Sequence, residues 1–360
     1  MKRLAQVLAL LSLALSVLAL MHSKPLLGPI AAIPLAPLKL LAGALTPVTV
    51  VLGGLGVLFG IVSRSPWTVL ASGTATTLAA RYIRRVTTCH TGSDPALVAG
   101  RGRMPARQVS PHLVAGKVQH RWTRFFTPAP ATRWMRDMAF WTVSESDGHP
   151  PCQLLCDIWQ SPRSITPSGL ACIFFHGGGW HQFDKDSLTR PVFRHLAGQG
   201  HVVMDVAYRL HPEADLIAMV GDAKRAVAWM KANARRYDVD PDQIVVAGGS
   251  AGGHLALMAA YTPGHPQLTP ACLGDLDASV RAVVAYYPIV DLKSYIAYND
   301  YPTLNLGHFE LPSPRGVVPD LVGGLPAQVP ERYDLLSPAN HASRECPPTL
   351  LLQAGHDHVV

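Results

Sequence analysis

The residues from Ile244 to Met258 read Ile-Val-Val-Ala-Gly-Gly-Ser-Ala-Gly-Gly-His-Leu-Ala-Leu-Met, an apolar run followed by a glycine-rich turn and the start of a helix. The turn contains Gly248-x-Ser250-x-Gly252, the spacing that places a serine on a sharp change from strand to helix. Small neighbours are required because a Cβ at Gly248 or Gly252 would collide with the turn or the sheet. This stretch predicts that Ser250 is a nucleophile. The alternative is a glycine-rich helix start without a catalytic role.

A second motif reads His-Gly-Gly-Gly-Trp from His176 to Trp180, follows an apolar run and lies 74 residues before Ser250. Consecutive glycines allow backbone N–H groups to turn toward a developing alkoxide. The helix after Ser250 adds its own N–H groups and its dipole at the same point. Together, the two motifs predict an acyl-transfer site with an oxyanion loop.

Short apolar runs alternate with helical segments from about Asp137 onward, which is the pattern of a parallel sheet with crossover helices. The segment from Leu216 to Tyr237 has apolar residues at helical spacing and is expected to be one crossover helix. The expected strands are Met138 to Val143, Leu154 to Trp159, Leu170 to Phe175, Val202 to Val206, Ile244 to Ala247, Val280 to Tyr286 and Thr349 to Gln353. The pattern predicts an α/β fold with a mostly parallel sheet flanked by helices.

In the combination of these motifs, residues 134–360 resemble the α/β-hydrolases, in particular HGGG-type esterases of the hormone-sensitive-lipase and feruloyl-esterase-like groups. Further matches are the run from Asp205 to Pro212 and the pairs Asp240-Pro241, Tyr287-Pro288 and Ser337-Pro338. The resemblance implies an α/β-hydrolase fold and a serine carboxylesterase or lipase-like hydrolase that forms an acyl-enzyme. It implies a small-molecule or lipid ester as substrate, and no cofactor.

The resemblance also implies roles for single residues. Ser250 would be the nucleophile, Asp357 the acid that orients the catalytic histidine, and His176 a residue that braces the loop. The oxyanion N–H groups would come from Gly178, Gly179 and Ala251, with Gly177, Gly248 and Gly252 supporting the backbone shape. Trp180 and the insertion from Leu292 to Pro330 would shape the acyl pocket, although an ordinary surface excursion is an equal alternative for the insertion. Two rival carboxylates, Asp222 and Asp291, are expected to be structural.

The chain departs from the family pattern after Asp357. In this fold the histidine follows the acid, usually some tens of residues later, whereas three residues follow Asp357 here. His358 is too close along the chain to Asp357 to replace that histidine. We therefore expect a C-terminally truncated hydrolase that lacks the last strand, the last helix and the catalytic histidine, and that is itself inactive or weakly active.

Two other functions fit these motifs. A membrane-tethered pseudohydrolase would keep the fold and bind a partner or lipid, and an amidase or formamidase would use the same constellation. Carbohydrate esters, prenylcysteine methyl esters and lipid esters all fit as substrates. Six cysteines without a Cys-x-x-Cys pair, and sixteen histidines without His-Glu-x-x-His, indicate neither a disulfide framework nor a metal site.

The N-terminal region, residues 1–86, has the composition of a membrane segment. The whole chain is 48% hydrophobic and 15% charged, with a mean hydropathy of +0.17. Uncharged stretches at about residues 4–21 and 40–62 are long enough to be transmembrane helices. Within the second stretch, Gly56-x-x-x-Gly60 predicts a close-packing face between helices.

The positive charge is concentrated in one part of the chain. From Arg64 to Asp137 there are 12 Lys and Arg residues against two acids. The basic segment 87–133 is expected to be a solvated linker or to lie on anionic lipid headgroups. Because the charge belongs to one segment, no nucleic-acid partner is expected. Arginines after the second span predict a multi-pass membrane protein whose hydrolase domain, residues 134–360, faces the cytoplasm. The alternatives are a third crossing at Trp67 to Ala80, which would invert this orientation, and a signal peptide in place of the first span.

Overall fold

The structure is a computed structural model. It describes residues 2–20, 42–43, 45–88, 131–144, 151–187, 189–298, 304–306, 309–311 and 314–353. The chain separates into two compact units, residues 1–109 with 118–120 and residues 110–117 with 121–360. Most of the predicted basic linker, 87–133, lies outside the described residues, so the predicted domain boundaries stay predictions.

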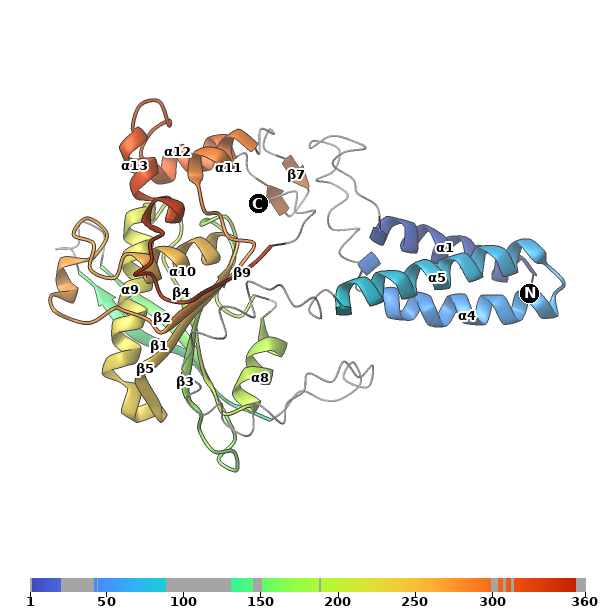
Figure 1. The fold of residues 1–360 in the computed structure, drawn as a ribbon, viewed down its shortest axis with the longest axis horizontal. Helices are drawn as coiled ribbons and strands as arrows, with labels where there is room; N and C mark the ends of the chain where they lie inside the picture. The colour runs from blue at the N-terminus through green and yellow to red at the C-terminus, as the bar shows by residue number, and fades with distance from the viewer. Residues whose placement is uncertain are drawn as a thin grey trace. The chain divides into compact units, whose positions relative to one another are not determined.

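The second unit is built around a seven-stranded sheet with the strand order β1-β2-β4-β3-β5-β6-β9 (Figure 1). Its strands are β1 (Arg133–Val143), β2 (Cys152–Gln160), β3 (Gly169–Phe175), β4 (Val202–Ala207), β5 (Val239–Gly249), β6 (Ala282–Tyr286) and β9 (Thr349–Leu352). From β4 to β9 all neighbours are parallel, as predicted, whereas β1–β2 and β2–β4 are antiparallel. The residues 144–151 between β1 and β2 are too few for a crossover, which needs about a dozen. The sheet is therefore mixed.

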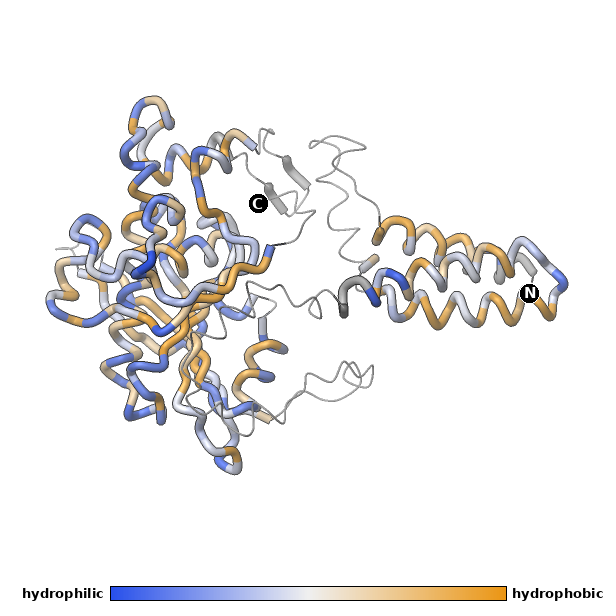
Figure 2. The backbone as a smooth tube through the Cα atoms, in the orientation of Figure 1, coloured by the Kyte–Doolittle hydropathy of each residue, from blue (hydrophilic) through white to orange (hydrophobic). Residues whose placement is uncertain are grey.

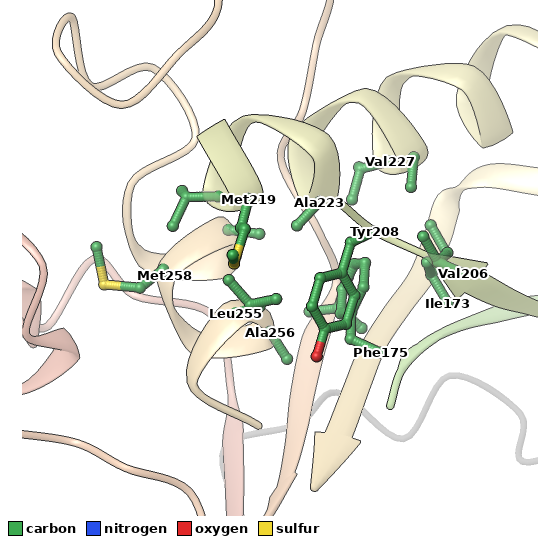
Figure 3. Packing of buried hydrophobic residues seen from close by; sticks show 14 of the residues in the cluster. Ile173, Phe175, Val206, Tyr208, Met219, Ala223, Val227, Leu255, Ala256 and Met258 are labelled. Carbon is green, nitrogen blue, oxygen red and sulfur yellow. The ribbon is translucent and has the colours of Figure 1, made fainter. Parts of the chain in front are cut away.

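Helices cover both faces of this sheet because side chains along a buried strand point alternately to its two sides. The helices are α8 (Arg190–Gly198), α9 (Leu216–Ala232), which is followed by the 3-10 helix η3 (Ala234–Tyr237), and α10 (Ala251–Tyr261). On one face Ile173 and Phe175 pack with Val227 of α9 and Leu255 of α10 (Figure 3). On the other face Cys172 packs with Phe193 of α8. The predicted crossover helix is confirmed as α9 and η3.

An insertion with three helices separates β6 from β9. Its elements are α11 (Leu292–Tyr298), β7 (Leu304–Leu306), β8 (Phe309–Leu311), α12 (Pro314–Val322), α13 (Pro330–Leu335) and the 3-10 helix η5 (Pro338–His341). A further 3-10 helix, η4 (Ala271–Leu273), lies between α10 and β6. Val318, Leu321 and Tyr333 of this insertion are buried in the same core as α9 and α10. The insertion is therefore a packed part of the second unit.

A buried ion cluster joins the segment after β4 to α9. Asp222 is fully buried and accepts hydrogen bonds of 2.7 to 2.9 Å from the guanidinium groups of Arg209 and Arg225. It also accepts the backbone N–H of Arg209 at 3.2 Å. Both charges of such a buried pair are compensated by hydrogen bonds, and removing either partner would leave an uncompensated charge in the core. The carboxylate therefore stabilises the fold. Asp222 therefore has the structural role that was expected for it.

Two buried aspartates face each other on β2 and β4. Asp157 and Asp205 are register partners, and both are fully buried. Asp157 accepts the Trp134 Nε1–H at 2.8 Å and lies 3.3 Å from Lys185 Nζ. Asp205 accepts the backbone N–H of Asp186 at 2.5 Å, and its other oxygen has no partner among the described residues. Burial raises the pKa of Asp205 well above its usual value, and the charge of Asp157 adds to the rise.

The described part of the first unit is a group of long helices. These are α1 (Lys2–Leu20), α4 (Thr46–Val62) and α5 (Pro66–Thr88). The Ser16 hydroxyl of α1 donates a hydrogen bond to the Ala75 carbonyl of α5 at 3.0 Å. Among the helices that the structure describes, none combines the length and the apolar character that crossing a membrane requires.

The two predicted transmembrane spans therefore lack support in the structure. The span at 40–62 corresponds to α4, which begins only at Thr46, beside Pro47, and has 17 residues. About 20 apolar residues are needed to cross the hydrocarbon core. The span at 4–21 corresponds to α1, which includes the charged residues Lys2 and Arg3. The helix α5 is not among the predicted spans, because its Ser, Thr and Arg residues lower the hydropathy of that stretch.

Burial in the first unit is the reverse of that in a water-soluble bundle. The buried residues are small or polar, namely Ala9, Ser12, Ser16, Ala42, Thr46, Thr49, Gly53, Gly56, Gly60, Thr68, Ser72, Ala75 and Ala79. The exposed residues include large apolar ones, namely Val7, Leu10, Leu11, Val17, Val48, Val51, Leu52, Leu55, Leu58, Phe59, Ile61, Val62, Trp67 and Leu70. Figure 2 shows hydrophilic residues near the turn between α4 and α5 and toward the end of α5.

The glycines of α4 show why these helices approach closely. A Cβ added to Gly56 would lie 2.4 Å from Ser72 Oγ, and one added to Gly60 would lie 2.7 Å from Val69 Cγ2. At Gly54, by contrast, nothing lies within 4 Å. Gly56 and Gly60 therefore form a close-packing face toward α5, as predicted, whereas the membrane character of these helices stays a prediction.

Replacing Asp205 with Asn is expected to stabilise the second unit at neutral pH and above. The pKa of Asp205 is higher in the folded state than in the unfolded state, so between these two values the folded state keeps a proton that the unfolded chain releases. The free energy of unfolding therefore falls as pH rises from the unfolded-state pKa toward the folded-state pKa. An asparagine has no such proton. Calorimetry should show that Asp205→Asn raises Tm by about 2–4 °C or more at pH 8, with a smaller difference at pH 4.5.

The exposed Asp334→Asn is the control for this measurement, because its carboxylate is not buried. It should change Tm little at either pH. An equal or negative shift for Asp205→Asn at pH 8 relative to pH 4.5 would contradict the assignment of a raised pKa.

Candidate active site

Ser250 lies on the tight turn between β5 and α10. Its backbone has φ 53° and ψ −122°, a strained conformation for a residue with a side chain. Its N–H donates to the Tyr286 carbonyl at 2.9 Å, and its carbonyl accepts the His254 N–H at 2.9 Å. Ser250 is partly exposed. The sharp change from strand to helix that the sequence predicts is therefore present.

Two glycines allow this turn to form. A Cβ added to Gly252 would lie 2.1 Å from the Phe175 carbonyl oxygen, and one added to Gly248 would lie 2.3 Å from the Gly252 carbonyl oxygen. Both neighbours are backbone atoms, so no side chain fits at either position. As a result α10 begins against the end of β3, with its unpaired N–H groups and the positive end of its dipole beside Ser250.

The glycine loop after β3 lies against the serine turn. A Cβ placed on Gly177 would be 3.6 Å from the Ser250 Cβ, so the two segments are in contact. Gly178 and Gly179 have φ values of 127° and 60°, which are left-handed conformations that favour glycine. The predicted oxyanion donors Gly178 and Gly179 thus directly follow a residue that touches the serine turn, and Ala251 follows Ser250 itself.

His176 is buried beneath this loop and braces it. Its Nδ1 lies 2.7 Å from the Gly177 carbonyl oxygen, and its ring stacks on Tyr208 with 4.4 Å between ring centroids. The Tyr208 hydroxyl donates to the His176 carbonyl at 2.8 Å. Burial lowers the pKa of His176, so the ring stays neutral at physiological pH. This geometry suits a bracing residue, as the resemblance implies, rather than a base.

Trp180 lies inside the core at the end of the same loop. Its side chain is 1% exposed. The indole is packed edge to face with His254, at 5.3 Å between ring centroids, and with Tyr295 of α11, at 6.4 Å. The structure therefore places Trp180 between the loop, α10 and the insertion.

The candidate acids fall into two groups. Asp357, the predicted triad acid, lies outside the described residues. Asp291 accepts the Ser294 N–H at 2.7 Å at the start of α11, and Asp222 belongs to the buried ion cluster, so both have structural roles. Within the described ranges, no group of His, Cys, Asp and Glu residues has the arrangement of a metal site.

The contacts of Tyr208 and His254 beside the site were not predicted from the sequence. His254 is fully buried, and its Nε2 lies 2.8 Å from the Leu336 carbonyl oxygen. Burial lowers the pKa of His254 to about 4, so this ring is not the base for Ser250. The available signal was its position four residues after Ser250, on the same side of the helix. For Tyr208 the sequence gives no sign that the hydroxyl reaches back to the glycine loop.

Similar proteins of known sequence include several esterases. Over 207 residues the chain is 32% identical to the probable carboxylic ester hydrolase LipM of Mycobacterium tuberculosis, covering 57% of this chain and 45% of that protein. Over 213 residues it is 32% identical to the esterase LipC of the same organism, covering 59% and 50%. The chain thus spans about half the length of these relatives.

Among solved structures, the apo form of Thermogutta terrifontis esterase 2 is similar at 23% identity and a TM-score of 0.45, covering 63% of this chain and 73% of that one. The sequence model of the BD-FAE family matches residues 156–360, which is more than half of the chain. This range contains the glycine loop, the serine turn and every strand from β3 to β9. The chain therefore belongs to the BD-FAE family.

Proposed function

We propose that this protein is a serine ester hydrolase. The observation that carries the proposal is the contact between the glycine loop at Gly177 and the strained turn at Ser250. With Ser250 as the nucleophile and the loop glycines as donors, this contact would bring the hydroxyl and several backbone N–H groups to one point, which is what acyl transfer requires. The names of the relatives, carboxylic ester hydrolase and esterase, support the same reaction class.

In the proposed reaction, the Ser250 Oγ attacks the carbonyl carbon of an ester and the alcohol leaves. The negative oxygen that forms is held by the N–H groups of Gly178, Gly179 and Ala251. Water then hydrolyses the acyl-serine to release the acid. The reaction needs a histidine that takes the Ser250 proton, with Asp357 as the acid that orients it. No cofactor takes part, and the substrate is a small-molecule or lipid ester.

In the full-length enzyme, which includes the histidine that the reaction needs, Ser250→Ala should abolish the reaction while leaving the fold intact. Without the hydroxyl no acyl-enzyme forms, so turnover of nitrophenyl esters should fall by about 10³-fold or more, and labelling by a fluorophosphonate probe should be lost. The control is Ser279→Ala, which removes a surface hydroxyl beside Lys231. Ser279 lies before the N-terminal end of β6, whereas Ser250 follows the C-terminal end of the parallel neighbour β5.

A mutant that still labels at the wild-type rate would refute Ser250 as the nucleophile. A protein that contains the catalytic histidine and folds, but neither labels nor turns over esters, would favour the pseudohydrolase. Faster cleavage of matched anilides than of nitrophenyl esters would favour an amidase.

We also propose that the first unit holds the hydrolase unit at a membrane, with the hydrolase unit on the cytoplasmic side. The reversed burial supports this, because small and polar groups between helices and large apolar groups outside suit a hydrocarbon surrounding. The proposal rests on the joint outer surface of the helices and not on any single spanning helix. No acid precedes Asp94, Arg64 lies in the turn before α5, and Arg81 and Arg84 lie toward its other end, so anionic headgroups at either end of this helix would meet positive charge.

Leu55→Asp should weaken association with lipid. Leu55 of α4 is 46% exposed, and a carboxylate there would enter the apolar surface that contacts acyl chains. Flotation of the full chain with vesicles of phosphatidylcholine and phosphatidylglycerol should recover markedly less of this mutant than of the wild type. Leu276→Asp is the matched control, because Leu276 is 49% exposed on the second unit. Equal flotation of the two mutants would count against the lipid-facing surface.

A further inference from the structure

His254 is a buried titratable group that the proposed reaction does not use. It lies one helical turn after Ser250, and its side chain is fully buried. A carbonyl oxygen only accepts hydrogen bonds, so the contact with Leu336 places the imidazole proton on Nε2. The other ring nitrogen, Nδ1, is buried without a hydrogen-bond partner among the described residues. The ring, which belongs to the helix that follows Ser250, thus makes one hydrogen bond, from Nε2 to the Leu336 carbonyl oxygen.

Leu336 lies where the C-terminal part of the insertion between β6 and β9 meets its N-terminal part. The next residue, Ser337, accepts the Leu292 N–H through its hydroxyl at 3.1 Å and donates to the Tyr333 carbonyl at 2.7 Å. The Ala339 N–H donates to the Val290 carbonyl at 3.0 Å. The two ends of the insertion are therefore tied together where His254 makes its bond.

The same imidazole also contacts the glycine loop through Trp180. The indole packs edge to face against His254 and, on α11, against Tyr295. Trp180 directly follows Gly179, and its own φ of 65° is rare for a residue with a side chain. His254 therefore contacts the glycine loop through the Trp180 ring and the insertion through its hydrogen bond to the Leu336 carbonyl.

We propose that His254 is a positioning residue that fixes both the glycine loop and the insertion relative to Ser250. The proposal rests on the proposed hydrolase function, since the loop is the one that would hold the oxyanion. It differs from the role of an ordinary core histidine, which would contribute stability alone. Here the ring contacts two separate segments beside the nucleophile, and a displacement of about 1 Å in such a site can cost about 10²-fold in rate.

Two variants separate these roles. His254→Leu keeps the bulk but leaves the buried Leu336 carbonyl without its donor. His254→Gln offers an amide N–H at about the reach of Nε2 and should restore the bond. The control is His201→Leu. His201 is also buried, but it bonds Ser168 at the N-terminal ends of β4 and β3, whereas Ser250 follows the C-terminal end of the parallel strand β5.

The experiment measures two quantities on the full-length protein, including the catalytic histidine that the reaction needs. The first is the rate of labelling by a fluorophosphonate, with kcat and KM for a short nitrophenyl ester. The second is hydrogen exchange in peptides covering residues 177–183 and 292–298. For His254→Leu we expect labelling and kcat to fall about 10-fold or more at nearly unchanged KM, with faster exchange in both peptides. His254→Gln should stay within about 3-fold of the wild type.

The control His201→Leu should lower Tm without changing exchange in either peptide. The proposal is refuted if His254→Leu labels at the wild-type rate and exchanges like the wild type, or if His201→Leu reproduces all its effects. A wild type that does not label, with exchange that still rises in both peptides of His254→Leu, would refute the hydrolase function and leave the positioning role supported.

Discussion

The close approach of three backbone segments at Ser250 is the constraint on which the rest of the site depends. Gly252 lies against the end of β3, and Gly248 lies against the first turn of α10, at distances that exclude any Cβ. Since the neighbours are backbone atoms, the fit cannot be relieved by side-chain rotation. The strained φ and ψ of Ser250 persist because β5, α10 and β3 are each fixed by the buried core. The same contact fixes the position of the glycine loop, because the loop follows directly after β3.

Much of this arrangement could be predicted because its signals are local. The inner strands, such as β3 and β4, are mostly buried and are continuous apolar runs. The edge strands β1 and β9 are largely exposed but are also rich in apolar residues, so all seven strands of the sheet were predicted from the sequence. The glycine spacing predicted the turn at Ser250. The antiparallel pairing of β1 with β2 was not predicted, because apolar runs do not show strand direction and the pairing follows from the short connection between the two strands. The roles of His254 and Tyr208 were missed because each depends on a carbonyl group distant in sequence, 82 and 32 residues away. The triad acid, Asp357, stays a prediction.

The first unit shows a different limit. Hydropathy identified apolar stretches but gave neither the start of α4, which is shifted by Pro47, nor the existence of α5, whose polar residues hide it. The glycine spacing at Gly56 and Gly60 was informative because close packing needs small residues at one helical face. Which apolar side chains lie outside depends on the contacts among three helices, and no window along one stretch contains that information.

The parallel pairing of β3 with β5 has a consequence for how the chain acquires reactivity. These neighbours in the sheet are joined by a long connection that contains β4, the helices α8 and α9 and the 3-10 helix η3, so their meeting closes a large loop and is entropically slow. The backbone of Ser250 can be held in its strained form only after β3 has docked. In the proposed hydrolase, a chain emerging from the ribosome would therefore carry an ordinary serine hydroxyl at this position, and a partly folded chain would have no activated serine to attack an ester. Activation of the serine would then be a property of the assembled core.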